Sequence, residues 1–376
     1  MSIIFIKKIK NRRLVGDDIM TFNDVLEIKN GRNQRAVEDS DGRYPIYGSG
    51  GIMGYAKDYI CNAETIIIGR KGSINKPIFV DEPFWNVDTA FGLEAKREVL
   101  FPRYLYYFCK HYDFQQLNKT VTIPSLTKSD LLKIEIKLPC LSDQQAIVHR
   151  LQSVEQIINL HHQQLEKLDD LIKARFVEMF GDPVGNPKGW TMVPLGTRCE
   201  IITGNTPSRA EAKNYGEFIE WIKSDNINTP YTFLTEAQEY LSEIGFQKCR
   251  FVEAGSLLMT CIAGSVNCIG NVAVADRRVA FNQQINAIVP NEDEVLYLYW
   301  LMLLSKPAIH RAINMALKGI LSKRQLSEMM FPFPPVALQK QFVTFVEQTD
   351  KSKVAVQKAL EQTQLLFDSL MQKYFG

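Results

Sequence analysis

Apolar side chains recur at alternating steps of four and three residues along one stretch of the chain, which predicts a helix with a continuous apolar seam. The stretch follows Pro139, Ser142 can cap its first turn, and Gly181 with Pro183 stops it. We therefore predict a helix over 142–180, about 58 Å long at 1.5 Å per residue. The seam consists of Ile147, Leu151, Val154, Ile158, Leu165, Leu168 and Ile172, and is interrupted by His161.

The same pattern returns 195 residues further on, where residues 321–376 match residues 126–181 without a gap. Both copies close on a Phe-Gly pair, and Gln339 stands where the first copy has Gln144. The second seam is more polar and so has the greater need of a partner. Its positions are Phe342, Val346, Thr349, Lys353, Val356, Leu360, Thr363, Phe367 and Leu370.

Two long helices of one chain can cover each other's seams by packing antiparallel, which predicts a pseudo-twofold coiled coil. The alternative is that each seam faces only the globular part of its own half. Seams of this length rarely fit one small core, so the antiparallel pair is the interpretation we favour.

The residues before each long helix form two related globular parts of α/β type with small β-sheets. Short β-rich runs alternate with turn clusters, and a helix is predicted in each half, over 101–117 and 294–313. Residues 27–33 resemble 200–206 at a shift of 173, which is smaller than the later shift, so the second half carries extra residues early. The predicted parts are a lead at 1–20 that is an edge strand or disordered, globular parts at 21–138 and 182–335, and helical segments at 139–181 and 336–376. The second globular part opens with a linker at 182–194, which is rich in proline and glycine.

Composition and charge narrow the class of protein without defining it. The chain of 376 residues is 45% hydrophobic and 23% charged with a net charge of +2, as in globular proteins of more than one domain. A polyanion would have to be bound by local patches. The seven cysteines include no C-x-x-C pair, which argues against a disulfide framework or zinc ribbon and favours a reducing cytoplasm. No apolar run is long enough to predict a membrane span.

Catalytic motifs are scarce. The sequence has neither a phosphate-binding G-x-x-x-x-G-K-[ST] loop nor the Asn/Asp-Pro-Pro-aromatic tetrapeptide of amino-methyltransferases. Asp81, Glu94 and Lys96 faintly resemble the metal-binding acids and lysine of a nuclease, in which carboxylates hold Mg²⁺. Such triplets are common by chance, and we keep the nuclease only as an alternative.

Glycine-rich loops with basic, aromatic and amide side chains give a stronger signal, for nucleic acid. Glycine lets a backbone approach a phosphate, Arg and Lys neutralise it, and Asn or Arg can read base edges. Any single member can equally be a solvated loop residue, and the two parallel sets together carry the prediction. The candidate DNA-binding residues in the first half are Arg43, Tyr44, Tyr47, Tyr55, Arg70, Lys71, Ser73, Asn75 and Lys76. In the second half they are Thr206, Ser208, Arg209, Lys213, Lys223, Ser224, Asp225, Asn226 and Ser265.

From about residue 21 onward the chain resembles the specificity (S) subunits of type I restriction-modification systems. The resemblance rests on the repeat, on "IPSLTKSDLLKIEIKLPCLSDQQ", on "EIKNGRN" and "GRKGSINK", and on "GNTPSRAEAKNYGEFIEWIKSDNIN". The run "LEKLDDLIKARFVEMFGDP" followed by "NPKGW" is especially typical. The lead before Met20 is not required by the family pattern.

The resemblance implies two target-recognition domains, each reading one half of a bipartite double-stranded DNA site, held apart by the two helices. It implies no catalytic residue and no cofactor on this chain. The partners implied are two modification subunits, which bind S-adenosylmethionine and methylate adenine N6, and two restriction subunits, which use ATP and Mg²⁺. Apart from the nuclease, the remaining alternative is a coiled-coil scaffold that reads no bases.

Overall fold

The computed structural model describes residues 18–117, 125–313 and 319–376, which fall into two compact units. Unit 1 comprises Met1–His162 and Lys358–Gly376, and unit 2 comprises Gln163–Gln357. Each unit therefore contains one globular part together with a portion of both long helices. Of the expected lead at 1–20, residues 1–17 lie outside the described residues, and the structure begins with strand β1 (Asp18–Thr21).

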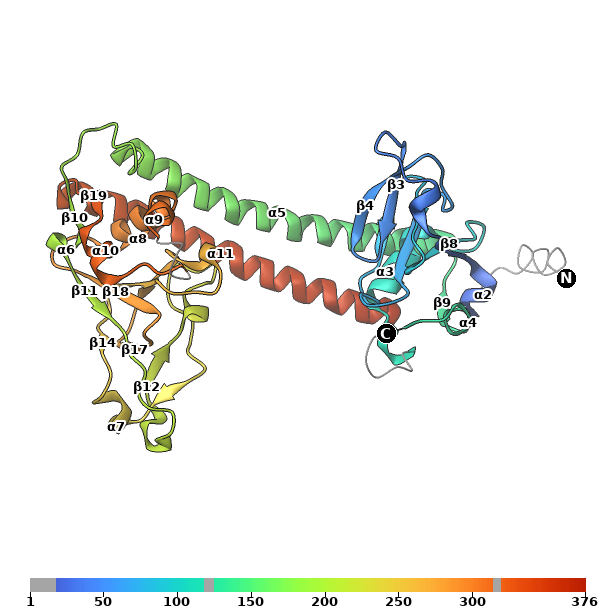
Figure 1. Cartoon of the computed structure of the whole chain (residues 1–376). Helices are drawn as coiled ribbons and strands as arrows, with labels where there is room; N and C mark the ends of the chain where they lie inside the picture. Colours follow the sequence, from blue (N-terminus) through green and yellow to red (C-terminus); the bar gives the residue numbers. More distant parts are fainter. Residues whose placement is uncertain (1–17, 118–124, 314–318) are drawn as a thin grey trace, which may run out of the picture. The chain divides into compact units, whose positions relative to one another are not determined.

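A four-stranded antiparallel sheet forms the centre of unit 1 (Figure 1). Its strand order is β2 (Leu26–Asn30), β8 (Ala90–Ala95), β5 (Thr65–Gly69) and β6 (Ile78–Val80). Helix α3 (Pro102–His111) packs on this sheet, because Leu105 belongs to the same buried cluster as Ile66 and Leu93. Burying each such side chain contributes roughly 1.5–3 kcal/mol.

A smaller three-stranded sheet adjoins it in unit 1, with the order β4 (Gly51–Ala56), β3 (Tyr44–Gly48) and β7 (Trp85–Asn86). Strands β3 and β4 form a hairpin, whereas β3 and β7 are parallel. The remaining elements of the globular part are α2 (Phe22–Val25), α4 (Lys128–Leu131) and β9 (Glu135–Leu138), the last of which pairs with β1.

Unit 2 repeats this topology. Its antiparallel sheet has the order β11 (Cys199–Thr203), β18 (Ile285–Pro290), β15 (Ser256–Thr260) and β16 (Val272–Ala275). Its second sheet has the order β13 (Tyr240–Leu241), β12 (Tyr215–Ile222), β17 (Val279–Phe281) and β14 (Phe251–Val252), and again one pair, β12 with β17, is parallel. The further elements are α6 (Leu195–Arg198), α7 (Glu243–Phe246), α10 (Lys323–Glu328), β10 (Met192–Pro194) and β19 (Met330–Pro332).

The extra residues of the second half can now be placed. Strands β12 and β15 are separated by residues 223–255, which hold β13, α7 and β14. In unit 1 the corresponding strands β3 and β5 are separated only by residues 49–64, which hold β4. The insertion that the sequence predicted therefore lies between strands β12 and β15, and it adds β13 and β14 to the second sheet of unit 2.

Three sequence-based boundaries need correction. The helix predicted over 101–117 stops at His111 and is followed by a separate 3-10 turn at Phe114–Leu117. The helix predicted over 294–313 is two helices, α8 (Val295–Leu304) and α9 (Lys306–Ala312), because Pro307 cannot continue the first. The end of the segment 182–194, expected to be a linker, is strand β10, which pairs with β19.

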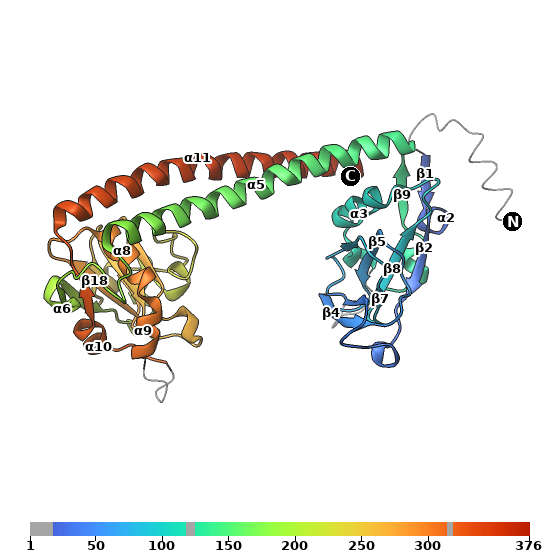
Figure 2. The same cartoon turned by 90° about the horizontal axis from the view of Figure 1, so that it is seen from above.

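The two long helices are α5 (Leu141–Phe180) and α11 (Val336–Phe375). Within each unit they lie side by side in both views (Figures 1 and 2). In unit 1 Arg150 donates to the hydroxyl of Tyr374 over 3.1 Å, and in unit 2 Lys353 forms an ion pair with Asp169 at 2.5 Å. From the first contact to the second, the residue number rises along α5 and decreases along α11. The two helices therefore run antiparallel.

Every position of the predicted seam is buried or half-buried. In unit 1 Leu151 and Val154 of α5 share a buried cluster with Phe367 of α11. In unit 2 Ile172 shares one with Phe342 and Val346. These clusters also contain the domain helices, so the seam covers the globular parts as well as the second helix. The seam positions therefore lie against both the second long helix and the globular parts.

Candidate nucleic-acid interface

One edge of the unit 1 sheet gathers several loops, and we call it the loop edge of unit 1. Strand β2 ends there at Asn30, β5 ends there at Gly69 and β8 begins there at Ala90. Backbone hydrogen bonds connect the loops: the Arg32 amide donates to Asn86 over 2.8 Å and the Arg70 amide to Thr89 over 2.8 Å. The loops therefore form one continuous surface.

This loop edge carries exposed basic side chains. They are Arg32, Arg35, Arg70, Lys71 and Lys76. Within the described parts of the chain none of the five has an ion-pair partner, so all are available to neutralise phosphates. Gly31 is required here because a Cβ atom would lie 1.7 Å from the Val87 carbonyl oxygen. The close approach of the two loops thus depends on glycine.

The opposite edge of the same sheet holds the residues of the nuclease alternative. Asp81 follows β6 and pairs with Arg103 at 3.0 Å, while the Glu94 carboxylate accepts from the Asn62 amide over 2.8 Å. The ammonium group of Lys96 donates to two backbone carbonyls of α2, that of Asn23 over 3.1 Å and that of Asp24 over 2.8 Å. The three side chains are thus held by separate partners and form no joint site. Among the described residues no group of three or more His, Cys, Asp or Glu side chains is arranged to hold a metal ion.

The predicted DNA-binding residues of the first half separate into three groups. Those on or beside the loop edge are Tyr47, Arg70, Lys71, Ser73 and Lys76, and all except the half-buried Tyr47 are exposed. Arg43, Tyr44 and Tyr55 lie at the other end of the β3–β4 hairpin, where Tyr44 opposes Ala56. Asn75 is engaged within the fold, because its amide donates to Asp113 over 2.6 Å and accepts from the Phe114 backbone over 2.8 Å. Asn75 is therefore not retained as a reading residue.

Unit 2 has a loop edge built on the same hydrogen bonds. The Asn205 amide donates to Phe281, the counterpart of Asn86, over 3.1 Å, and the Cys261 amide donates to Gln284, the counterpart of Thr89, over 2.8 Å. Gly204 again approaches the neighbouring turn so closely that a Cβ atom would lie 2.2 Å from the Asn282 carbonyl oxygen. The framework of the two edges is therefore the same.

The chemistry of the two edges differs. Cys261 and Ile262 stand where unit 1 has Arg70 and Lys71, and Asn205 stands where unit 1 has Arg32. Six amide side chains lie at the loop edge of unit 2: Asn228 and Gln283 are exposed, Asn205, Asn271 and Gln284 are half-buried, and Asn282 is buried. Unit 1 thus presents several exposed cations at this edge, whereas unit 2 presents exposed amides beside the cation Arg250.

The predicted residues of the second half are more widely spread. Thr206 lies on the loop edge, where its hydroxyl donates to Gln283. Ser265 is exposed in the loop after β15. Ser208 and Lys213 are exposed in the segment before β12, and Ser224 and Asp225 follow β12.

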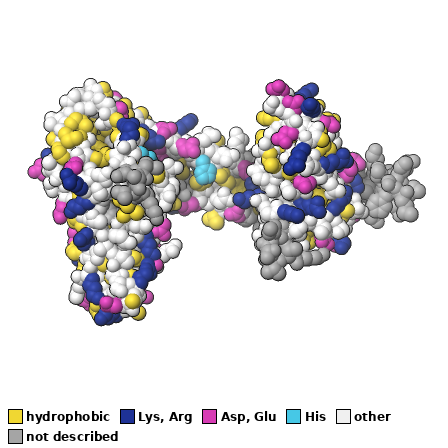
Figure 3. Space-filling view, in the orientation of Figure 1, with side chains coloured by type: hydrophobic (Ala, Val, Ile, Leu, Met, Phe, Trp, Pro, Cys, Tyr) yellow, Lys and Arg dark blue, Asp and Glu magenta, His cyan; other side chains and the backbone are white. Residues whose placement is uncertain are grey.

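Arg209 and Lys223 form a cluster with a shared acid beside β12. Both pair with Glu239, at 2.9 and 2.5 Å, and both lie over the ring of Trp221. The hydrogen bond from Lys223 is the main reason why the pKa of Glu239 is lowered. Asn226 is buried and its amide donates to the Glu236 carbonyl over 3.0 Å, so it serves the fold. Figure 3 shows further Lys and Arg side chains over the part of unit 2 that contains β12 and α7.

Sequence reasoning missed Arg32, Asp88, Asn205 and Gln283. Arg32 and Asn205 directly follow the loop glycines, in the two segments already recognised as repeats, "EIKNGRN" and "EIITGNT". That alignment was the available signal. Asp88 and Gln283 had no such signal, because their equivalence depends on hydrogen bonds between segments distant in the sequence.

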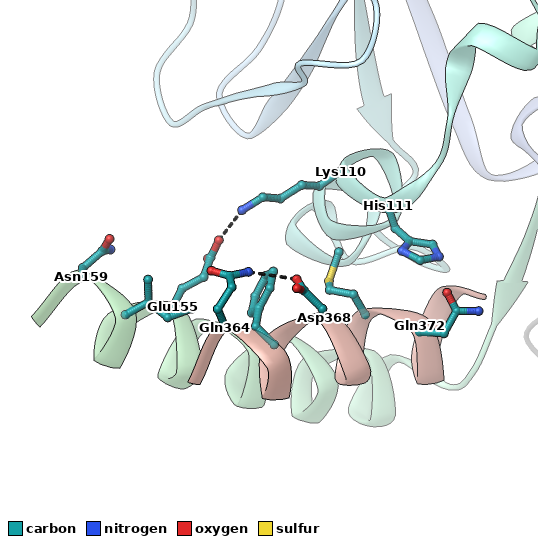
Figure 4. A pocket seen from close by; sticks show the side chains of 10 residues that line it. Lys110, His111, Glu155, Asn159, Gln364, Asp368 and Gln372 are labelled. Atoms are coloured by element: carbon teal, nitrogen blue, oxygen red, sulfur yellow. Dashed lines mark hydrogen bonds and ion pairs between the residues drawn. The ribbon is translucent and has the colours of Figure 1, made fainter. Parts of the chain in front are cut away.

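A separate groove of about 640 Å³ in unit 1 is lined by α3, α5 and α11 (Figure 4). At its rim the Lys110 ammonium group contacts Glu155 at 2.6 Å, and the hydroxyl of Tyr107 donates to the same carboxylate over 2.5 Å. Burial and the Glu155 contact raise the pKa of Tyr107. These bonds fasten the domain helix to α5, so this end of the groove serves the fold.

The comparisons with known proteins agree with this architecture. The family model "Type I restriction modification DNA specificity domain" matches residues 17–170 and 187–364, which is most of the chain. The chain belongs to this family and carries two of its domains.

Curated relatives have related names. The chain is 26% identical over 196 residues to the type I restriction enzyme HindI specificity subunit of Haemophilus influenzae, a match covering 49% of this chain and 41% of that protein. It is 22% identical to the EcoBI specificity subunit of Escherichia coli, with 97% of this chain and 80% of that protein covered. The first of these matches thus spans less than half of the relative's length.

Two solved structures share the fold. A type I restriction-modification S subunit from M. genitalium has a TM-score of 0.58 and 18% identity, covering 97% of this chain and 98% of that one. A chain from a study of complex assembly and conformational transition of the type I R-M system has a TM-score of 0.59 and 17% identity, covering 96% and 98%. In the described segments of the present chain no helix has the length and apolarity to span a bilayer.

Proposed function

We propose that this chain reads a bipartite double-stranded DNA target, with unit 1 contacting one half-site through its loop edge and unit 2 contacting the other. The observation that carries the proposal is that one framework is built twice and lined with different side chains. Two identical reading surfaces would recognise a symmetric target, whereas a cationic edge and an amide-rich edge recognise different bases. Family membership supports DNA as the ligand.

The same proposal assigns the long helices to partner binding. Leu171 and Leu366 occupy equivalent positions of the repeat, and their exposed fractions are 49% and 51%. Exposed apolar side chains repeated in this way suit two copies of one partner, since a pseudo-twofold chain must offer equivalent surfaces to both. We assign these surfaces to two modification subunits, and two restriction subunits complete the larger complex.

In this proposal the chain itself is not catalytic. S-adenosylmethionine belongs to the modification subunits, ATP and Mg²⁺ belong to the restriction subunits, and adenine N6 is methylated by the partner. The complex would work in the cytoplasm, where the DNA is. The ammonium group of Lys96 donates to backbone carbonyls, which favours a non-catalytic chain over the nuclease alternative.

The test is to produce the full chain with its modification subunit in a host that lacks adenine methylation and to map the methylated sites by modification-sensitive sequencing. A motif of two short specified halves separated by an unspecified gap of fixed length supports the proposal. Methylation without such a motif contradicts it, and DNA cleavage by the isolated chain with Mg²⁺, abolished by Glu94→Ala, would favour the nuclease instead.

A further inference from the structure

A short turn at each loop edge occupies the same place in both units. In unit 1 it is the turn 86–90 between β7 and β8, and in unit 2 it is the turn 281–285 between β17 and β18. Asp88 and Gln283 stand at the equivalent position near the middle of the turn, and both side chains are exposed.

The equivalence of the two turns follows from matching backbone hydrogen bonds. The Ala90 amide donates to Val87 over 3.0 Å, and the Ile285 amide donates to Asn282 over 3.2 Å, which closes each turn. Each turn is also tied to the second sheet, through Val87 to Tyr47 over 3.1 Å in unit 1. The corresponding bond in unit 2 runs from Asn282 to Ile222 over 3.0 Å. Both turns are therefore fixed on strands by the same backbone hydrogen bonds, while their side chains differ, including the exposed one at the middle.

Resting on the proposed function, we propose that this position selects one base pair in each half-site, with Asp88 accepting a hydrogen bond from cytosine and Gln283 bonding adenine. It thus acts as a specificity determinant in both units. Neither residue belongs to the glycine-rich basic segments that the sequence singled out.

The chemistry of Asp88 supports base reading rather than phosphate binding. It is a carboxylate on an edge whose other exposed charges, such as Arg70 and Lys71, are positive, and no ion-pair partner holds it among the described residues. A carboxylate is repelled by phosphates, so at a DNA surface it is useful as an acceptor. The donor that suits it in the major groove is the N4 amino group of cytosine.

Gln283 is oriented by its neighbour. The hydroxyl of Thr206 donates to its Oε1 atom, which restrains the position of the amide oxygen. A carbonyl oxygen has two acceptor sites, so the amide keeps one acceptor and both Nε2 donors for a ligand. A side-chain amide with one donor and one acceptor free matches adenine N7 and N6.

The experiment uses the full chain with its modification subunit and compares methylation motifs of wild type, Asp88→Asn and Gln283→Glu. Both variants keep the size of the side chain. Asp88→Asn replaces an acid by an amide, and Gln283→Glu replaces an amide by an acid. Matched controls are Glu98→Gln and Asn291→Asp, exposed residues that follow β8 and β18 at the opposite end of the sheets. Circular dichroism and native mass spectrometry check folding and assembly of every variant.

We expect Asp88→Asn to change the preferred base at one position of one half-site by about tenfold and to leave the other half-site unchanged. Gln283→Glu should do the same in the other half-site, and the controls should keep the wild-type motif. An unchanged motif in both variants, or a uniform loss of methylation at all sites by a folded and assembled variant, would overturn the inference. A wild-type complex that methylates no gapped motif would instead contradict the proposed function itself.

Discussion

Phe375, the penultimate residue, packs against Tyr104 with ring centroids 5.0 Å apart. Phe180 packs against Tyr297 at the same centroid distance of 5.0 Å in the other unit. Both tyrosines are almost fully buried, and each donates its hydroxyl to the strand that precedes a long helix. The last turn of each long helix thus docks onto the domain helix of the other half, which explains physically why the chain carries the same helix ending twice.

Truncating these aromatic rings should destabilise one unit at a time. Phe180 is 1% exposed, so Phe180→Ala should lower the stability of unit 2 by about 4 kcal/mol. Phe375 is half-buried, so Phe375→Ala should lower the stability of unit 1 by about 2 kcal/mol. Hydrogen exchange measured by mass spectrometry resolves the two units. Protection lost equally in both units by either variant would contradict this assignment.

The repeated glutamines should act in the same way in both halves. Gln144 is fully buried, accepts from the Phe101 amide over 2.7 Å and donates to the Pro139 carbonyl over 2.8 Å. Gln339 likewise accepts from the Glu294 amide over 3.0 Å, where α8 begins. Replacing one by leucine leaves a buried amide unpaired, which costs about 1–3 kcal/mol.

We therefore expect Gln144→Leu to raise hydrogen exchange at the start of α3 and Gln339→Leu to raise it at the start of α8. Each variant is the control for the other. If exchange at these amides stayed at the wild-type rate, the glutamines would not be the groups that cap the domain helices.

The ion pair between Lys353 and Asp169 predicts a specific pH dependence. Burial, the largest single effect, lowers the pKa of Lys353, but its bonds to Asp169 and Asp350 together outweigh it, so the pKa is raised above 10.5. A raised pKa stabilises the fold below the unfolded value and loses this contribution as pH rises through the folded value. Lys353→Met should therefore differ most from wild type below pH 10.5 and approach it above.

The measurement is the melting temperature of unit 2 as a function of pH, with the exposed Lys351→Met as control. A difference between wild type and Lys353→Met that stays constant from pH 7 to strongly alkaline pH would show that the ammonium charge contributes nothing.

Partner binding should depend on the repeated exposed leucines. Leu171→Glu and Leu366→Glu should each remove one modification subunit from the complex, because a carboxylate cannot be buried in an apolar contact without a large cost. Native mass spectrometry counts the subunits. Val354→Glu is the matched control, since Val354 is 69% exposed and has no apolar counterpart in the first copy. Loss of both partners, or of neither, would place the docking surface elsewhere.

The sequence predicted best what depends on local spacing. The alternation of four and three residues determines which side of a helix is apolar, and the seam positions from Ile147 to Phe367 are all buried or half-buried. The break between α8 and α9 was also predictable, because Pro307 lies within the expected helix.

The candidate site was less predictable because its residues are defined by distant partners. Asn75 and Asn226 have the residue type that reads bases, and only Asp113 and Glu236 reveal that their amides are already used. The order of strands and the shared loop edge likewise depend on pairings between segments far apart in the chain. Residue type suggested a candidate interface, and the tertiary structure shows which of its residues lie on the loop edges.

The central claim is that each unit reads one half of the target independently. The most direct measurement replaces residues 21–138 with the corresponding part of another family member and maps adenine methylation by the reconstituted complex. The account predicts a motif in which one half changes and the other half is retained. An unchanged motif, or one altered in both halves, would contradict it.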